Sequence, residues 1–159
     1  MREWWENFWE MLKKCFNSFI LPCLECCTPA WSSASDSHFK LLDRNVRSCQ
    51  FLIPDLEIDL GHRRVVSSLC MLYKIFHNPR HPLNSELPNF FEPARITRYA
   101  SRANSLAFEA VRHNTNQYER SFIPAATRLW NALPNHIVES QELQRFKIGV
   151  NNFFKRCDR

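Results

Sequence analysis

The chain has 159 residues, of which 45% are hydrophobic, 13% aromatic and 23% charged. This length is sufficient to bury a core, and the thirteen Phe and five Trp residues exclude a fully disordered chain. The two glycines, Gly61 and Gly149, are too few for Gly-rich phosphate loops, dinucleotide fingerprints or folds built from many β-hairpins.

The net charge of +5 is unevenly distributed. Residues 1–60 contain six Lys and Arg against nine Asp and Glu, a net charge of −3, whereas residues 61–159 contain fifteen against seven, a net charge of +8. A basic C-terminal part favours a polyanionic partner such as RNA or DNA. The alternative is that this charge belongs to an ordinary solvated surface.

Residues 3–21 have the periodicity of an amphipathic helix, and we divide the chain into this N-terminal helix (1–22) and one remaining region (23–159). The helix is expected to pack on its own domain, to bind a partner helix, or to lie on a membrane surface. Its mixed-sign polar face disfavours a membrane surface, and no apolar run is long enough for a transmembrane segment. The acidic N-terminus is unlike a secretory signal, so we expect an intracellular, soluble protein with reduced cysteines. The apolar face contains Trp5, Phe8, Trp9, Leu12, Phe16, Phe19 and Ile20.

Cys23 and Cys26 have the spacing of half a zinc site. A complete site needs a second Cys or His pair at a similar spacing, and the nearest candidates are His38 alone, Cys49 alone and the distant pair His77 and His81. We therefore predict no metal and no cofactor.

Two further helices are expected before the middle of the chain. The first follows Ser35 or Asp36 and ends at Pro54, and its buried side is formed by Phe39, Leu42, Val46, Cys49 and Ile53. The second begins near Leu60 with Asp59 as its cap, and its core side is formed by Val65, Val66, Leu69, Tyr73 and Phe76.

The second of these helices starts with His62, Arg63 and Arg64, cations that oppose the helix dipole in its first turn. One interpretation is that the two arginines bind phosphate or a carboxylate ligand. The other is that they form salt bridges with Asp55, Glu57 or Asp59, just upstream.

The region from Asn78 to Gln117 is rich in proline and irregular. Residues 106–111 and 117–123 favour one short β-hairpin. Arginines are spread over residues 95–128, with Tyr99 and Tyr118 among them. Arginine interleaved with aromatic residues can follow a nucleic-acid backbone while the rings stack on bases. These arginines are Arg95, Arg98, Arg102, Arg112, Arg120 and Arg128.

Residues 118–154 contain two expected helices. Pro124 suits the first turn of one helix, which ends before Pro134, and Ser140 is a reasonable cap for the next. Both helices are expected to contribute to a small aromatic core around Trp130. In total the sequence predicts a mainly α protein with four or five helices, an irregular middle and one hairpin.

Motifs for catalysis are missing. A two-metal polymerase needs closely placed aspartates, and the chain has no Asp-Asp pair. The Gly-x-Ser-x-Gly and His-Glu-x-x-His motifs are also absent. We therefore expect no enzyme activity.

Several segments together resemble the C-terminal tail of non-LTR (LINE-type, jockey-like) retrotransposon polyproteins. The resemblance covers about residues 16–154 and depends on the order HRR, LYKI, SFIP and LWNALP. It also includes LPCLECCTPAWSSASDSHFKLLDRNVRSCQFL, PARITR and the later FK. At Cys23 and Cys26 the family typically has an apolar residue and a tyrosine, which disfavours zinc further.

The family's activity is RNA-directed DNA synthesis, and its catalytic core lies upstream of this tail. The resemblance therefore implies a non-catalytic fragment of a reverse transcriptase polyprotein, and no catalytic residue carries over. One hypothesis is that the fragment binds RNA or DNA; the other is a structural or interaction module without a nucleic-acid role. Severance from the catalytic core would expose apolar surface and favour self-association through Trp5, Phe8, Trp9 and Phe16. The expected phosphate contacts are Arg63, Arg64, Arg95, Arg98, Arg102, Arg120 and Arg128.

Overall fold

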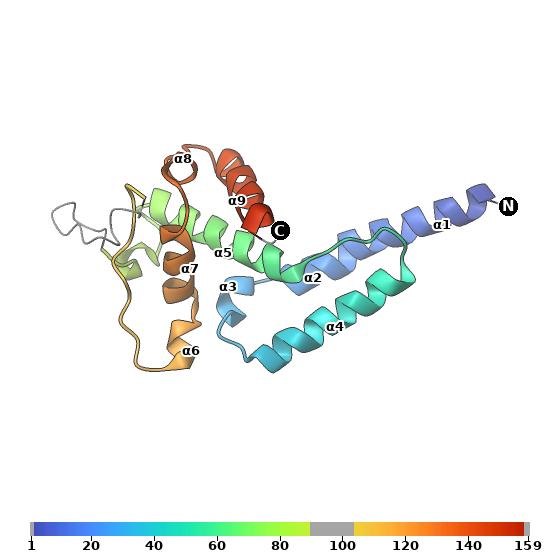
Figure 1. The fold of residues 1–159 in the computed structure, drawn as a ribbon, viewed down its shortest axis with the longest axis horizontal. Helices are drawn as coiled ribbons and strands as arrows, with labels where there is room; N and C mark the ends of the chain where they lie inside the picture. Colours follow the sequence, from blue (N-terminus) through green and yellow to red (C-terminus); the bar gives the residue numbers. More distant parts are fainter. Residues whose placement is uncertain (1, 90–103, 158–159) are drawn as a thin grey trace.

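The computed structural model describes residues 2–89 and 104–157. These residues are mainly α-helical, as the sequence predicts, and contain no β-strand. The helices form two parts, a long projecting arm and a rounded head (Figure 1). Five helices in the described part are ten residues or longer, and the others are single turns.

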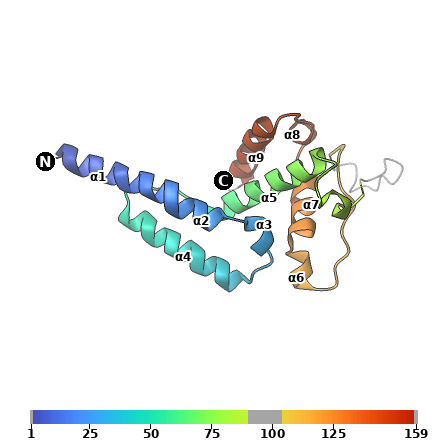
Figure 2. The same cartoon turned by 180° about the vertical axis from the view of Figure 1, so that it is seen from behind.

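The arm is a pair of antiparallel helices. α1 (Arg2–Cys15), a π-helical turn (Phe16–Ile20) and α2 (Leu21–Glu25) form one continuous helix, which extends past the predicted end at residue 21. α4 (Asp36–Leu52) runs back along it, and the linker 53–59 returns beside both helices to the head (Figures 1 and 2). The N-terminal end of α1 extends beyond the end of α4 in both views.

The arm has its own hydrophobic core. The π-helical turn contributes to it because the Leu21 N–H donates to the Phe16 carbonyl, five residues back, which turns both side chains toward the same side. The linker also takes part, since Leu56 is buried. The buried residues of this cluster are Phe16, Leu21, Val46, Ile53, Leu56 and Leu60.

The head is organised around α5 (Leu60–His77), which packs against α7 (Phe122–Asn131), α9 (Leu143–Cys157) and the short α3 (Thr28–Trp31). Asp59 caps α5 as predicted, and its carboxylate accepts a hydrogen bond from the His62 N–H at 3.1 Å. Two further single turns, α6 (Asn116–Glu119) and α8 (Asn135–Val138), flank α7.

Trp130 is fully buried at the centre of the head, as predicted. Its ring lies 5.8 Å from Phe76, 5.7 Å from Phe108 and 5.5 Å from Phe146, measured between centroids. Its indole N–H donates to the Leu106 carbonyl at 2.8 Å, which satisfies the one polar atom of the ring. α9 begins at Leu143, three residues after the predicted cap.

The predicted hairpin is wrong. The residues expected in its second strand form α6 and the start of α7, and Thr115 caps α6 by accepting from the Tyr118 N–H at 3.2 Å. The backbone N–H and C=O groups of Phe108 are hydrogen bonded to a side chain instead. The Asn131 amide accepts from the Phe108 N–H and donates to the Phe108 carbonyl, both at 2.8 Å. This pair replaces the two hydrogen bonds of a neighbouring strand.

Phe146→Ala is expected to lower the free energy of unfolding by about 3–5 kcal/mol, because it leaves a cavity beside Trp130 and Tyr73. Ile148→Ala is the matched control on the same helix, where the side chain is exposed, and should change stability by less than about 0.5 kcal/mol. Urea denaturation followed by circular dichroism measures both, and equal effects would contradict the core described here.

Candidate nucleic-acid interface

Three consecutive residues at the start of α5 contact three different helices. His62 Nε2 is hydrogen bonded to Asn151 Oδ1 of α9 at 2.9 Å. Arg63 donates hydrogen bonds from Nε and a terminal nitrogen to the Glu25 carboxylate of α2. Arg64 donates to Asp43 Oδ1 of α4 at 2.8 Å. We call His62, Arg63 and Arg64 the junction, because they connect the arm to the head.

The junction shows which carboxylates lie beside Arg63 and Arg64. Both arginines pair with carboxylates, but the prediction that these belong to Asp55, Glu57 or Asp59 is wrong. The hydrogen bonds that Arg63 donates to the Glu25 carboxylate raise the pKa of Arg63. The Arg64 guanidinium also lies 4.7 Å from the centroid of the Phe39 ring, a cation–π contact. Neither arginine is free to bind phosphate without breaking these contacts.

The other predicted arginines are not gathered into one surface. Arg120 pairs with Asp36 of α4 at 3.2 Å, and Arg128 pairs with Glu119 of α6 at 3.0 Å. Arg95, Arg98 and Arg102 lie outside the described residues. The four described arginines therefore bind carboxylates at separate places.

A row of cations on α4 was not predicted from the sequence. Lys40, Arg44 and Arg47 are exposed and form no ion pair within the described residues. The two acids of α4 do not neutralise them, because Asp36 pairs with Arg120 and Asp43 with Arg64. The signal was present in the sequence as the i, i+4, i+7 spacing on the side opposite the apolar stripe. We call these three residues the basic row.

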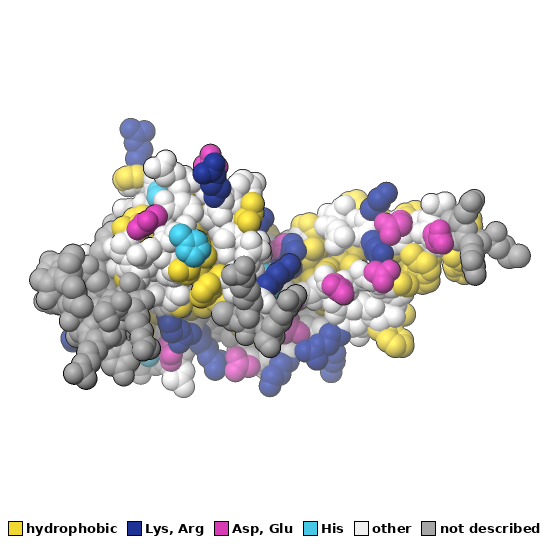
Figure 3. Space-filling model, turned by 45° about the horizontal axis from the view of Figure 1, so that its top comes forward, with side chains coloured by type: hydrophobic (Ala, Val, Ile, Leu, Met, Phe, Trp, Pro, Cys, Tyr) yellow, Lys and Arg dark blue, Asp and Glu magenta, His cyan; other side chains and the backbone are white. Residues whose placement is uncertain are grey.

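Lys and Arg side chains lie along the lower edge of the molecule in Figure 3, with acidic side chains among them. The charge pattern on this face is therefore mixed. The three cations of the basic row lie on one helix face and form no ion pair with a described carboxylate.

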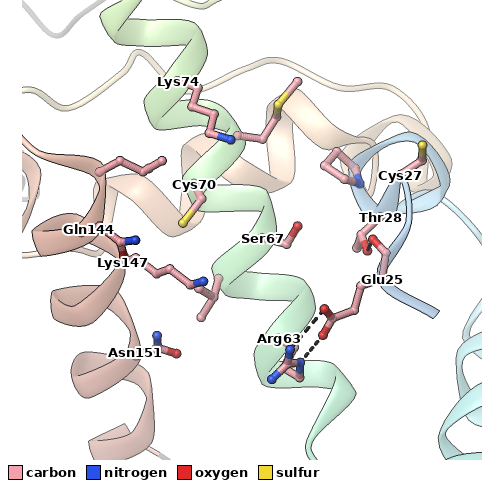
Figure 4. A pocket seen from close by; sticks show the side chains of 14 residues that line it. Glu25, Cys27, Thr28, Arg63, Ser67, Cys70, Lys74, Gln144, Lys147 and Asn151 are labelled. Atoms are coloured by element: carbon pink, nitrogen blue, oxygen red, sulfur yellow. Dashed lines mark hydrogen bonds and ion pairs between the residues drawn. The ribbon is translucent and has the colours of Figure 1, made fainter. Parts of the chain in front are cut away.

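A groove of about 440 Å³ lies between α3, α5 and α9 (Figure 4). Lys74 of α5 and Lys147 of α9 line it and form no ion pair within the described ranges. The one carboxylate in the groove, that of Glu25, is held by Arg63. The groove is therefore cationic, with apolar contributions from Val66, Met71 and Leu143.

Cys70 lies in the same groove, partly buried on α5 (Figure 4). Burial raises the pKa of its thiol, and the positive charges of Lys147 and Lys74 oppose that rise. At neutral pH the residue is therefore a thiol rather than a thiolate.

Cys23 and Cys26 are exposed near the end of α2. Cys26 Sγ lies 3.6 Å from Cys27 Sγ, and the hydrogen bond between the two thiols raises the pKa of Cys26. Within residues 2–89 and 104–157, no group of three His, Cys, Asp or Glu side chains is close enough to hold a metal ion.

Aromatic side chains cover the N-terminal end of α1. Trp4 stacks on Phe8 at 5.9 Å, and Trp5 and Trp9 contact Phe8 edge-on at 6.2 and 5.2 Å. Trp4 and Trp5 are 64% and 52% exposed. We call residues 4–9 the tip. Phe16, which we expected at the same surface, is only 2% exposed because it belongs to the arm core, so that part of the prediction is wrong.

The chain matches no protein-family model, no curated protein and no solved structure. The resemblance to a retrotransposon tail therefore stays a prediction that rests on the motifs alone. None of the described helices is long and apolar enough to cross a lipid bilayer.

Arg64→Ala is expected to lower the free energy of unfolding by about 2 kcal/mol, because Asp43 loses its partner and Phe39 its stacked guanidinium. The same substitution should cost less in an Asp43→Ala background, and this double-mutant cycle measures the coupling. Arg145→Ala is the control, since its pair with Glu142 is exposed and should contribute less than about 1 kcal/mol. Equal costs for both substitutions would contradict a structural role for the junction.

Cys70 is expected to react with iodoacetamide at pH 8 more slowly than the exposed Cys15, because its raised pKa and partial burial reduce the accessible thiolate. Peptide mass spectrometry over a time course measures both residues in one sample. Lys147→Ala removes a positive charge that lowers the pKa of Cys70. The substitution should therefore slow the reaction of Cys70 further.

Proposed function

We propose that this chain is a non-catalytic module that binds the phosphate backbone of RNA or DNA along the basic row of α4. Its proposed origin is the region downstream of the reverse transcriptase core of a non-LTR retrotransposon. The observation that carries the proposal is that Lys40, Arg44 and Arg47 are exposed on one helix face and pair with no carboxylate of residues 2–89 and 104–157.

The energetics of phosphate binding favour this row over the arginines predicted from the sequence. An arginine that already holds a carboxylate must give up that interaction before it binds phosphate, whereas an unpaired cation gives up only water and counterions. Binding at Arg63 or Arg64 would also disconnect the arm from the head. The basic row can be occupied without disturbing any ion pair of the fold.

The length of the row fits a nucleic-acid strand. Arg47 lies seven positions after Lys40, which corresponds to about 10 Å along an α-helix. One strand of B-DNA places a phosphate about every 3.4 Å along its axis, so the row spans about three phosphates. Such contacts give affinity without sequence specificity, because they do not reach the edges of the bases.

The proposed origin rests on the sequence motifs. The HRR motif is among the segments that carry the resemblance, and in this structure its three residues form the junction. A motif that connects three helices has a structural reason to occur in a module of this fold. The alternative function, a protein-interaction module, is favoured by the exposed tip.

The test is binding of a fluorescein-labelled single-stranded RNA and a DNA duplex, measured by anisotropy between 50 and 200 mM salt. We expect affinity to fall steeply with salt, and Lys40→Ala/Arg44→Ala/Arg47→Ala to reduce the single-strand salt slope by about 2 (about 0.7 for each lost contact). The matched control, Arg120→Ala/Arg128→Ala/Arg145→Ala, removes the same charge from ion-paired positions.

Two results would overturn the proposal. The first is binding that is absent or insensitive to salt. The second is an equal loss of affinity in both triple variants, which would attribute binding to net charge rather than to the basic row.

A further inference from the structure

The basic row of α4 continues into an exposed aromatic residue. Phe51 lies four positions after Arg47, so the extended row follows steps of four, three and four residues. In an α-helix these four positions fall within about 60° of one another around the axis. Cys49, which packs against the arm core, lies on the opposite side of α4. The extended row contains Lys40, Arg44, Arg47 and Phe51.

The fold leaves the end of this row uncovered. Phe51 is 91% exposed, the highest fraction among the large hydrophobic residues that the structure describes, and Leu52 beside it is 65% exposed. Both line one open hollow on the surface of α4 together with Arg44 and Arg47. No Asp or Glu of the described ranges lines this hollow. The Phe51 ring buries little apolar surface in the fold and lies beside cations without ion pairs, so it is available to a ligand.

We propose that this surface binds single-stranded RNA or DNA, with one base stacked on the Phe51 ring while the basic row contacts the phosphates. The inference rests on the proposed function, because it uses the same three cations, and it adds the type of strand that is bound. Cations that follow the backbone, next to an aromatic ring on which a base stacks, are the combination that binds single strands without sequence preference.

The spacing along α4 suits a base that is attached to the bound backbone. Phe51 lies about 6 Å beyond Arg47 along the helix axis. A base projects sideways from its sugar and phosphate, so a nucleotide whose phosphate contacts Arg47 can place its base on the ring. Every base has an aromatic face, and the contact therefore adds affinity without selecting a sequence.

A duplex does not offer its base faces to this surface. Each base in a duplex is stacked between its neighbours, and a side chain reaches a face only by unstacking a step, which has a free-energy cost. The bases of a single strand can turn outward and stack on an aromatic side chain. Phosphates are accessible in both. A duplex is therefore expected to bind through the basic row alone, and a single strand through the basic row and Phe51.

The distribution of apolar residues disfavours a membrane surface as the ligand. A helix that lies on a membrane buries a broad apolar face in the lipid and keeps its cations on the other side. On this face of α4 the apolar part is confined to the last turn, at Phe51 and Leu52. Three cations occupy the rest of the same face.

The test is fluorescence anisotropy of the full chain with three labelled probes of equal length. The probes are a single-stranded oligothymidylate, the same strand with abasic sugars, and a duplex. We expect the single strand to bind more tightly than the abasic strand, which keeps every phosphate but has no base to stack. Phe51→Ala should weaken binding of the single strand at least about fivefold, the loss expected for one stacked base. It should leave the abasic strand and the duplex unchanged.

Two further variants separate stacking from other effects. Phe51→Tyr keeps an aromatic face and should retain the affinity for the single strand. Phe19→Ala is the matched control, because Phe19 is also an exposed Phe of the arm, at 71%, but belongs to the π-helical turn of the other helix. The salt slope of Phe51→Ala should equal that of the unchanged chain, since no phosphate contact is removed. Circular dichroism checks that every variant is folded.

The results distinguish a failure of this inference from a failure of the proposed function. Equal single-strand affinities of Phe51→Ala and the unchanged chain, or an equal loss on the abasic strand, would overturn the inference. The proposed function would still stand if the triple variant of the basic row reduced the salt slope. Absence of salt-sensitive binding to all three probes would overturn both. Phe51-dependent binding to phosphatidylserine vesicles, with equal affinity for the normal and abasic strands, would assign the surface to a membrane instead.

Discussion

The structure depends on the ion pairs that Arg63 and Arg64 make at the start of α5. Two cations in the first turn of a helix oppose its dipole, so α5 begins with an unfavourable charge arrangement. The carboxylates of Glu25 and Asp43 offset this charge, and both belong to the arm. The arm and the head have separate hydrophobic clusters, and the junction connects them together with the Arg120–Asp36 pair and with Leu60, the first residue of α5, which is buried in the arm core.

Local patterns predicted much of this fold, and contacts between distant residues account for what they missed. The helices around Trp130, the start of α4 after Ser35 and the Asp59 cap follow from periodicity and capping chemistry, which act over a few residues. The hairpin failed because the Asn131 side chain, 23 residues away, supplies the hydrogen bonds of Phe108. The partners of Arg63 and Arg64 lie 38 and 21 residues away. A sequence shows that such carboxylates exist but not which of them come close.

The candidate site is a second case in which the sequence does not show which charged residues come close together. Counting arginines selected residues that the fold uses for its own ion pairs. The basic row has fewer positive charges, yet it is the better candidate for phosphate because both acids of α4 are occupied by arginines from other elements. Whether a surface cation is available to a ligand depends on where the carboxylates are, and this is known only once the helices are assembled.

The π-helical turn at Phe16–Ile20 sets the rotation of one half of the long helix relative to the other. In a regular α-helix, residues five apart lie roughly 140° from each other around the axis, so Phe16 and Leu21 could not both face α4. The wider turn removes this difference, and it leaves Phe19 71% exposed on the outside. Deleting one residue within the turn would leave the Phe16 and Leu21 side chains four positions apart in a regular α-helix, about 40° from each other, so both would still face α4. The π-helical turn therefore accommodates one additional residue in the long helix while the aromatic end of the molecule keeps the direction it would have in a regular helix.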